Sequence, residues 1–308
     1  MKIGIIGTGF VGSASAFSLV LRGIVNDLVL IDINKNKAQA EALDILHATP
    51  FTHQCRIIDG EYEDLEGADI IIITAGVNQK PGESRLNLLE RNAVVFKDII
   101  ANIIKFAADA IILVATNPVD VMTDFVIKES KLSPSRVFGS GTILDTSRFR
   151  TLLGEHLHLA SKSIHAYVLG EHGDSEVLIW STAKAGTMPV DDFAKASGNI
   201  LSEEIKNEID DNVRNAAYKI IAGKGATYYG IAGGIARICQ AIADDENVLL
   251  TVSSLHKDVE GIKDVCLSLP TIINRSGIKQ VIYPQLSLNE HNLLRQSAEK
   301  IKAYSEED

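Results

Sequence analysis

Short apolar runs alternate with longer, polar-faced segments through the first half of the chain. The apolar runs lie at Lys2–Ile6, Leu28–Ile33, Asp69–Thr74, Ala110–Ala115 and Val137–Gly139. Helical patterns lie between them at Lys35–Leu46 and Arg85–Phe106. Continuous runs of Val, Ile and Leu are typical of strands buried on both faces of a parallel sheet that helices cover. This order predicts a doubly wound α/β fold, in which ligands bind at the carboxyl ends of the strands.

The pattern changes after about residue 157. Ser163–Leu169 alternates between apolar and polar positions, and further strands of an antiparallel sheet are predicted at Val248–Ser254, Val265–Leu269 and Gln280–Tyr283. Helices are predicted at Ser202–Ile221, Gly225–Ala243 and Leu288–Ala303. We therefore expect a Rossmann-type domain over residues 1–141 and an α+β catalytic domain over residues 142–308, with the active site between them.

Composition excludes several classes of partner. The 308 residues carry a net charge of −10, from 40 acids and 30 bases, and no basic block occurs. Because an acidic surface repels phosphate backbones, nucleic acid is not expected as a partner. The uncharged run Ile3–Leu21 contains four glycines, which weaken it as a signal-peptide core. No other apolar run is long enough to span a membrane, so we expect a cytoplasmic protein.

The three cysteines are far apart and odd in number. Cys55, Cys239 and Cys266 match neither a disulfide framework nor the spacing of a metal knuckle. We therefore expect a reducing compartment, no metal site, and cysteines that serve as small buried hydrophobes.

The sequence "IGIIGTGFVG" places Gly7, Gly9 and Gly12 in G-x-G-x-x-G spacing, between a strand and a helix. Such glycines allow a tight turn, close approach of the backbone to a pyrophosphate, and close contact of helix and strand. The helix N-terminus then offers free N–H groups to the phosphates. Asp32 lies 20 residues past Gly12, at the end of the second strand. Its carboxylate can accept both ribose hydroxyls and would repel a 2′-phosphate, so the motif favours NAD over NADP.

Two further segments carry candidate chemistry. In the predicted helix "GTILDTSRFRTLLGEHL", Asp145 and Arg148 share a face, whereas Arg150 lies about 200° from Arg148 around the helix. A surface Asp–Arg pair, which is common and contributes little, is the alternative interpretation. In "GEHGDSE", His172 lies in a glycine-flanked loop after a strand, a position where catalytic residues concentrate, although a lone histidine is usually not catalytic.

Over essentially its full length the chain resembles the L-lactate/L-malate dehydrogenase family. The resemblance rests on segments in the family's order: "GTGFVG", "AGVNQKPGESRLNLLERN", "ATNPVDV", "GSGTILDTSRFR", "GEHGDSE" and "GATYYGIA". The chain begins almost at its first strand, as in the bacterial members, which lack the N-terminal arm of the vertebrate enzymes.

The resemblance implies a role for each matched residue. His172 would be the acid/base on the substrate carbonyl oxygen, and Asp145 would hold its imidazole and raise its pKa. Arg148 would bind the substrate carboxylate through two parallel hydrogen bonds, and Arg85 would polarise the carbonyl as its loop closes. Asn117 and Thr227 would orient and flank the substrate. The remaining cofactor positions implied are Gly7, Gly9, Phe10, Val11, Gly12, Asp32, Ala75, Gly76 and Asn117.

The loop residue Gln79 bears on the substrate. In this family the matching position faces the substituent on the third carbon of the substrate, and an arginine there would pair with the second carboxylate of oxaloacetate. A carboxylate shut beside the uncharged Gln79 would be buried unpaired, at a cost of several kcal/mol. The resemblance therefore implies pyruvate and L-lactate as substrates, with malate dehydrogenase as the alternative if Lys80 offers its ammonium instead.

The resemblance also implies an assembly and an effector. The family is usually dimeric or tetrameric, so we expect a homotetramer. In Gly225–Ala243 a stripe of small residues would allow close helix contact, either with another subunit or within the core; it consists of Ala226, Gly230, Gly233 and Gly234. In bacterial lactate dehydrogenases the residues matching Arg150 and His165 bind fructose 1,6-bisphosphate across a subunit interface. Members without this regulation also carry the pair. A dinucleotide-binding sensor without turnover is a third possibility, but it would not need Arg85, Asp145, Arg148 and His172 together.

Overall fold

The computed structural model describes the backbone of residues 1–77 and 85–306 and the side chains of residues 1–77 and 91–305. The first half builds a parallel sheet in the strand order β3-β2-β1-β4-β5-β6, which is the doubly wound order. Its strands are β1 (Lys2–Ile6), β2 (Asp27–Ile31), β3 (Arg56–Asp59), β4 (Ile70–Ile73), β5 (Ile111–Val114) and β6 (Val137–Gly139). The predicted doubly wound architecture is confirmed.

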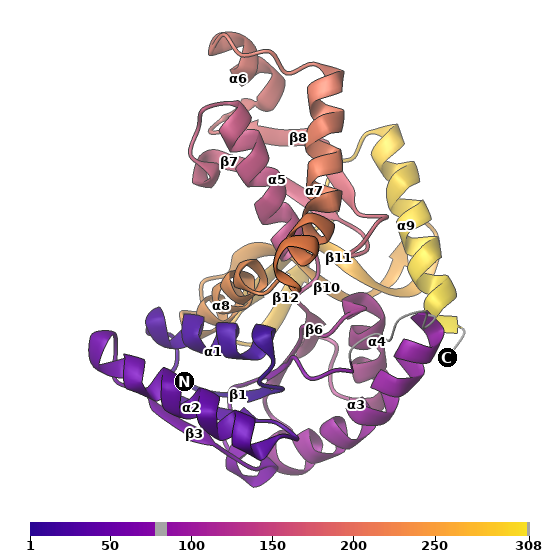
Figure 1. Cartoon of the computed structure of the whole chain (residues 1–308). Helices are drawn as coiled ribbons and strands as arrows, with labels where there is room; N and C mark the ends of the chain where they lie inside the picture. Colours follow the sequence, from indigo (N-terminus) through magenta and orange to yellow (C-terminus); the bar gives the residue numbers. More distant parts are fainter. Residues whose placement is uncertain (78–84, 307–308) are drawn as a thin grey trace.

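Helices cover both faces of this sheet (Figure 1). Those of the first half are α1 (Phe10–Leu21), α2 (Lys35–Ala48), α3 (Arg85–Ala107) and α4 (Val119–Ser130). Because successive side chains of a strand point to opposite faces of the sheet, the side chains of β4 contribute to two hydrophobic cores. Ile70 and Ile72 are buried in the core that contains Leu19 of α1. Ile71 and Ile73 are buried in the core that contains Phe96 of α3. The all-apolar strand sequence is thereby explained.

The second half supplies the predicted antiparallel strands, and some of them extend the parallel sheet. β10 (Val248–Val259) pairs antiparallel with β6 through Ser253 and Gly139, and β11 (Ile262–Asn274) and β12 (Gly277–Val281) follow outward. Within the described residues one mixed nine-stranded sheet results. A separate antiparallel sheet contains β7 (Ile164–Leu169), β8 (Val177–Ala185) and β9 (Met188–Pro189).

The helices of the second half are α5 (Ile143–His156), α6 (Val190–Ala196), α7 (Glu203–Lys224), α8 (Tyr229–Ala243) and α9 (Leu288–Glu306). The predicted helix Gly225–Ala243 was wrong at its start. Gly225 has a φ of +82° and caps the C-terminus of α7, a conformation that glycine adopts readily. Ala226 and Thr227 therefore lie in a connection between helices, and Ala226 is not part of the small-residue stripe of α8. In Figure 1, α8 lies beside α1, and α9 beside α4.

Among the described residues, no helix combines the length and the apolar character needed to cross a membrane.

Candidate active site

The glycine turn that joins β1 to α1 leaves little space for side chains at two of its three glycines. Gly7 has a φ of +99°, and a Cβ there would lie 2.5 Å from the backbone nitrogen of Ala75. A Cβ on Gly12 would lie 1.9 Å from the carbonyl oxygen of Gly7, so both positions require glycine for the fold itself. A Cβ on Gly9, in contrast, would meet no described atom within 4 Å. The turn is therefore packed tightly on the protein side at Gly7 and Gly12 and open at Gly9, the N-cap of α1.

Asp32 follows β2 directly and faces this turn. Its Oδ2 accepts hydrogen bonds from the Thr8 amide at 2.7 Å and the Thr8 hydroxyl at 3.0 Å, and its Oδ1 accepts one from the Asn34 amide at 2.9 Å. Burial alone would raise the pKa of Asp32, but the hydrogen bonds from Asn34 and Thr8 outweigh it and hold the pKa below its usual value. A charged carboxylate therefore lies beside the G-x-G-x-x-G turn, as the sequence predicts.

Two further loops leave the sheet at the same edge, after the neighbouring strands β4 and β5. The Thr116 hydroxyl donates to the carbonyl oxygen of Ala75 at 2.6 Å, and a Cβ on Gly76 would lie 2.6 Å from the Thr116 methyl group. Asn117 is exposed beyond these contacts. The loops therefore touch one another and present Ala75, Gly76 and Asn117 at the carboxyl edge of the strands.

The predicted pairing of Asp145 with Arg148 is present, and His172 joins it. Asp145 is 1% exposed, and its Oδ1 accepts a 2.8 Å hydrogen bond from Arg148 Nη1. Its Oδ2 lies 2.6 Å from His172 Nδ1. α5 supplies the acid and the guanidinium, and the turn after β7 supplies the imidazole. The interpretation of a surface Asp–Arg pair is wrong, because this carboxylate is buried and shared by two partners.

The charges in this cluster reinforce one another. Burial would lower the pKa of His172, but the Asp145 carboxylate, through its charge and its hydrogen bond, raises the pKa to about 9, with Asp120 and Glu176 adding to the effect. Burial would raise the pKa of Asp145, but His172 and Arg148 hold it below its usual value. An imidazolium next to a guanidinium, over one buried carboxylate, can donate a proton and bind an anion at the same place.

Comparisons with known proteins identify the family of this chain. The description "lactate/malate dehydrogenase, NAD binding domain" matches residues 1–139, and "lactate/malate dehydrogenase, alpha/beta C-terminal domain" matches residues 142–308. The chain belongs to the lactate/malate dehydrogenase family. It is 54% identical to the L-lactate dehydrogenase of Thermus aquaticus over 302 residues, which cover 98% of this chain and 97% of that protein.

A second relative and a solved structure are similar to the chain over nearly its whole length. The L-lactate dehydrogenase of Allorhizobium ampelinum is 51% identical over 98% of this chain and 97% of its own length. The crystal structure of a lactate dehydrogenase from a Medee basin deep-sea metagenome library superimposes with a TM-score of 0.95 at 42% identity, and covers 99% of this chain and 98% of that one. The resemblance to the family and the expectation of NAD as cofactor are therefore confirmed.

Part of the predicted dehydrogenase site lies outside the described residues. Gln79 and Lys80 belong to residues 78–84, and the side chain of Arg85, the first residue of α3, is outside the description as well. The loop is anchored just before this stretch, where the buried Asn92 of α3 accepts a 2.9 Å hydrogen bond from the Val77 amide. Sequence reasoning did not single out Asn92.

Thr227 lies close to the glycine turn because its neighbour Tyr228 packs there. Tyr228 stacks on Phe10, which is the first residue of α1, with ring centroids 5.2 Å apart. The half-exposed Thr227 therefore lies in a connection that packs against the glycine turn, although it does not begin α8 as predicted.

Several residues that hold the His172 turn were missed from the sequence. The His172 amide donates to Asp120 Oδ2 at 2.8 Å, and Asp120, in the first turn of α4, is 3% exposed. An acid in the first helical turn ordinarily indicates stabilisation by the helix dipole, so the sequence alone does not mark Asp120 as a residue of the site. From α9, the Ser297 hydroxyl accepts from the Glu171 amide at 2.8 Å and Lys300 Nζ pairs with Glu171 Oε2 at 2.8 Å. No local signal marks these two residues, since they lie far along the chain.

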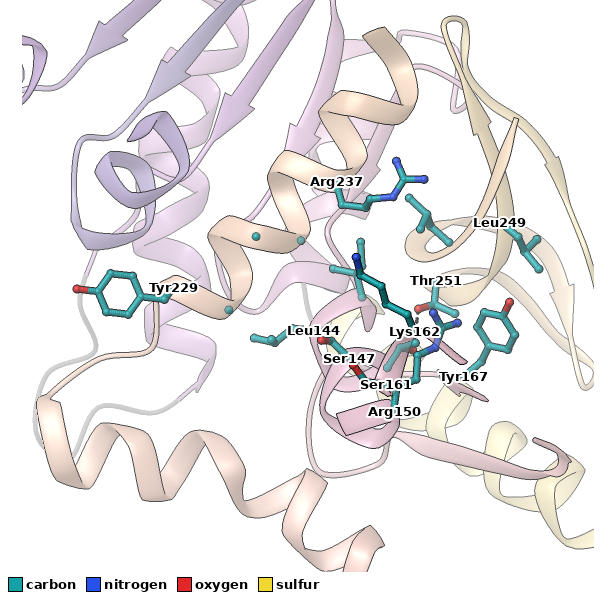
Figure 2. Close-up of a pocket in the computed structure, with 16 residues that line it drawn as sticks. Leu144, Ser147, Arg150, Ser161, Lys162, Tyr167, Tyr229, Arg237, Leu249 and Thr251 are labelled. Atoms are coloured by element: carbon teal, nitrogen blue, oxygen red, sulfur yellow. Dashed lines mark hydrogen bonds between the residues drawn. The ribbon is translucent and has the colours of Figure 1, made fainter. Parts of the chain in front are cut away.

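Arg150 and His165 occupy different environments. Arg150 Nε donates to the Ala166 carbonyl at 2.9 Å, and its guanidinium lies 4.8 Å from the ring centroid of Tyr167. Arg150 lines a cavity of about 430 Å³ between α5 and α8, together with Lys162 and Arg237 (Figure 2). His165 is exposed on β7 and is not among the described residues that line this cavity.

In the described part of the chain, no cluster of three or more His, Cys, Asp or Glu side chains has the arrangement of a metal site. All three cysteines lie in this part, and they are buried and free.

Proposed function

We propose that this protein is an NAD-dependent L-lactate dehydrogenase that interconverts pyruvate and L-lactate. The observation that carries the proposal is the buried Asp145 carboxylate, which binds the His172 imidazole and the Arg148 guanidinium at 2.6 and 2.8 Å. A proton donor and an anion-binding group are thereby fixed relative to each other, as a 2-oxo acid requires. Relatives that are about half identical over nearly the whole chain carry the name L-lactate dehydrogenase.

The nucleotide edge of the sheet fits the cofactor. The open face at Gly9 and the amides at the start of α1 suit the pyrophosphate, and the Asp32 carboxylate suits the ribose hydroxyls. Gly7, Phe10, Val11, Gly12, Ala75, Gly76 and Asn117 complete the proposed cofactor site. Bound NADH supplies the hydride for pyruvate reduction, and NAD⁺ accepts it in lactate oxidation.

His172 moves the proton. In pyruvate reduction its imidazolium donates a proton to the carbonyl oxygen, which becomes the hydroxyl of lactate. In lactate oxidation the neutral imidazole takes the hydroxyl proton. Asp145 holds Nδ1 and so directs Nε2 towards the substrate. One proton enters for each pyruvate reduced, and one leaves for each lactate oxidised.

The substrate carboxylate binds Arg148, whose planar guanidinium can form two parallel hydrogen bonds. Arg85 enters from the start of α3 and polarises the carbonyl, and closure of its loop excludes water from the charged site. Asn117 and Thr227 orient and flank the bound acid.

Gln79 sets the preference for lactate over malate. Its side chain carries no charge to pair with the second carboxylate of oxaloacetate, whereas the methyl group of pyruvate needs no partner. Initial rates of NADH oxidation with pyruvate and with oxaloacetate test this assignment. A large pyruvate preference is expected. A preference for oxaloacetate would contradict the assignment and indicate that Lys80 binds the second carboxylate. If NADH is not oxidised with any 2-oxo acid, the protein would instead be a dinucleotide-binding protein without turnover.

A second, regulatory function is fructose 1,6-bisphosphate activation of a homotetramer. Arg150 Nε donates to the carbonyl of Ala166, the residue after the exposed His165, and the proposed bisphosphate site combines this pair with the same pair of a second subunit. Adding fructose 1,6-bisphosphate to the pyruvate assay, and measuring the mass in solution with and without it, tests both parts.

A further inference from the structure

Glu176 is a buried acid beside the site that the proposed mechanism does not use. It lies just before β8, four residues after His172, and is 4% exposed. Its amide donates to the Gly173 carbonyl at 3.0 Å, which closes the turn that carries His172. Its Oε1 is buried and has no hydrogen-bond partner within the described part of the chain. Because an unpartnered buried carboxylate oxygen destabilises the fold, its presence at this place calls for a functional explanation.

The charges that face Glu176 come from three elements. Asp145 and Arg148 lie on α5, His172 lies in the turn, and Arg214 lies on α7. Burial, with the Asp145 carboxylate adding to it, raises the pKa of Glu176 to about 8, although Arg214, His172 and Arg148 oppose the rise. Glu176 is therefore largely protonated at neutral pH and becomes charged just as the medium turns alkaline.

His172 in turn is surrounded by three carboxyl groups: Asp145 from α5, Asp120 from α4, and Glu176. Asp145 is charged throughout the working range of pH, because its pKa is held low. Glu176 is different, since its charge appears only when the imidazolium begins to lose its proton. A negative charge that forms in a buried site strongly favours a cation nearby.

On the basis of the proposed function, we propose that Glu176 is a positioning residue that acts through His172. When Glu176 ionises, its charge keeps His172 in the proton-donating form and extends pyruvate reduction towards alkaline pH. The alternative is that Glu176 serves only to pack the turn and to offset the charge of Arg214. That role would affect stability but not the pH dependence of the reaction.

The test compares Glu176→Gln, which keeps the shape and removes the ionisation, with Glu176→Asp, which keeps the acid. Glu155→Gln, at an exposed position on α5, is the matched control for the loss of one carboxylate. kcat/KM for pyruvate is measured from about pH 6 to about pH 10. For Glu176→Gln the alkaline limb should move to lower pH by about half a unit, which lowers kcat/KM about two-fold near pH 9 and about three-fold near pH 10, and leaves it unchanged near pH 6. Glu176→Asp and Glu155→Gln should follow the wild type. An unmoved limb in a folded Glu176→Gln variant would overturn the proposal.

A second measurement does not depend on the variant or on turnover. In the wild-type protein labelled with ¹³C-histidine, the NMR titration of His172 should show an additional inflection near pH 8, where Glu176 ionises. A single-step titration would overturn the proposal even if Glu176→Gln does not fold. A protein that fails to reduce pyruvate would contradict the proposed function, whereas an active enzyme with a single-step titration would contradict only the role of Glu176.

Discussion

His172 Nδ1 and Asp145 Oδ2 lie 2.6 Å apart, and the carboxylate is almost completely buried. This contact raises the pKa of His172 to about 9. The imidazolium is therefore the form present at neutral pH, and in the proposed mechanism it is the form that donates the proton to the carbonyl oxygen of pyruvate. Pyruvate reduction should fall as pH rises through about 9, and lactate oxidation should rise over the same interval. The bond also stabilises the fold: because the pKa is raised on folding, that contribution is full below the ordinary histidine pKa of about 6.5 and is lost as pH rises through about 9.

Asp145→Asn should separate the proton chemistry from the fold. Without the carboxylate, burial acts on His172 unopposed by its main partner, so the pKa of His172 falls. We expect kcat/KM for pyruvate at neutral pH to drop about 10²-fold, and the alkaline limb to move down by about a unit or more. Steady-state rates across the pH range provide the measurement. A drop in rate with the limb in place would mean that Asp145 only orients the ring.

Arg148→Lys keeps the positive charge and loses the planar fork. A lysine ammonium cannot form two parallel hydrogen bonds to a carboxylate, so KM for pyruvate should rise about 10- to 100-fold. NADH affinity, measured by fluorescence titration without substrate, serves as the control and should not change. If KM stays at its wild-type value, the carboxylate binds elsewhere.

The sequence predicted best what depends on local spacing. Asp145 and Arg148 could be paired because residues three apart share a helix face, and Gly12 could be matched to Asp32 because the turn and the strand end follow a fixed order. The family resemblance added His172. Asp120 and Lys300 could not be found in this way, because they hold the His172 turn through tertiary contacts that no local pattern records. The same applies to Glu176, whose burial beside the site depends on the tertiary fold.

The same limit applies to the fold. The apolar runs predicted the parallel strands other than β3, but they did not predict that β10 joins the parallel sheet through the pairing of Ser253 with Gly139, more than a hundred residues apart, while β7 lies in a separate sheet. The start of α8 was mispredicted because residues Gly225–Tyr228 fit a helical pattern, while the positive φ of Gly225 is set by the end of α7.

Gly9→Ala and Gly12→Ala should differ in what they damage. A Cβ on Gly12 would lie 1.9 Å from the Gly7 carbonyl oxygen, so the turn must shift, and the free energy of unfolding should fall by roughly 3 kcal/mol. A Cβ on Gly9 meets no described atom within 4 Å, so the unfolding free energy should change by at most about 1 kcal/mol. It would instead occupy the side where the pyrophosphate binds and raise the dissociation constant for NADH about ten-fold or more. Denaturant melts and NADH titrations of both variants measure these effects. If Gly9→Ala and the wild type bind NADH equally well, the phosphates of the cofactor do not bind at this turn.

Gln79→Arg should move the substrate preference towards oxaloacetate. The new guanidinium would pair with the second carboxylate, which Gln79 leaves without a partner. The ratio of kcat/KM for oxaloacetate to that for pyruvate should rise about 100-fold or more. Lys80→Gln is the matched control, because it removes the neighbouring cation of the same loop and should leave the wild-type ratio in place. An unchanged ratio in Gln79→Arg would defeat the assignment of this position.

Arg150→Gln tests the effector site. Arg150 lines the cavity between α5 and α8 and donates to the Ala166 carbonyl, and a loss of its charge would remove one cation per subunit from the proposed interface site. If fructose 1,6-bisphosphate lowers KM for pyruvate in the wild type, the shift should vanish in Arg150→Gln and in His165→Gln, because the proposed site uses both side chains from each of two paired subunits. Lys162→Gln supplies the control, since Lys162 lines the same cavity but is not part of the proposed pair. If the change in KM persists in Arg150→Gln, Arg150 is not part of the effector site. If the change is lost in Lys162→Gln but kept in His165→Gln, the effector binds in the cavity of a single chain.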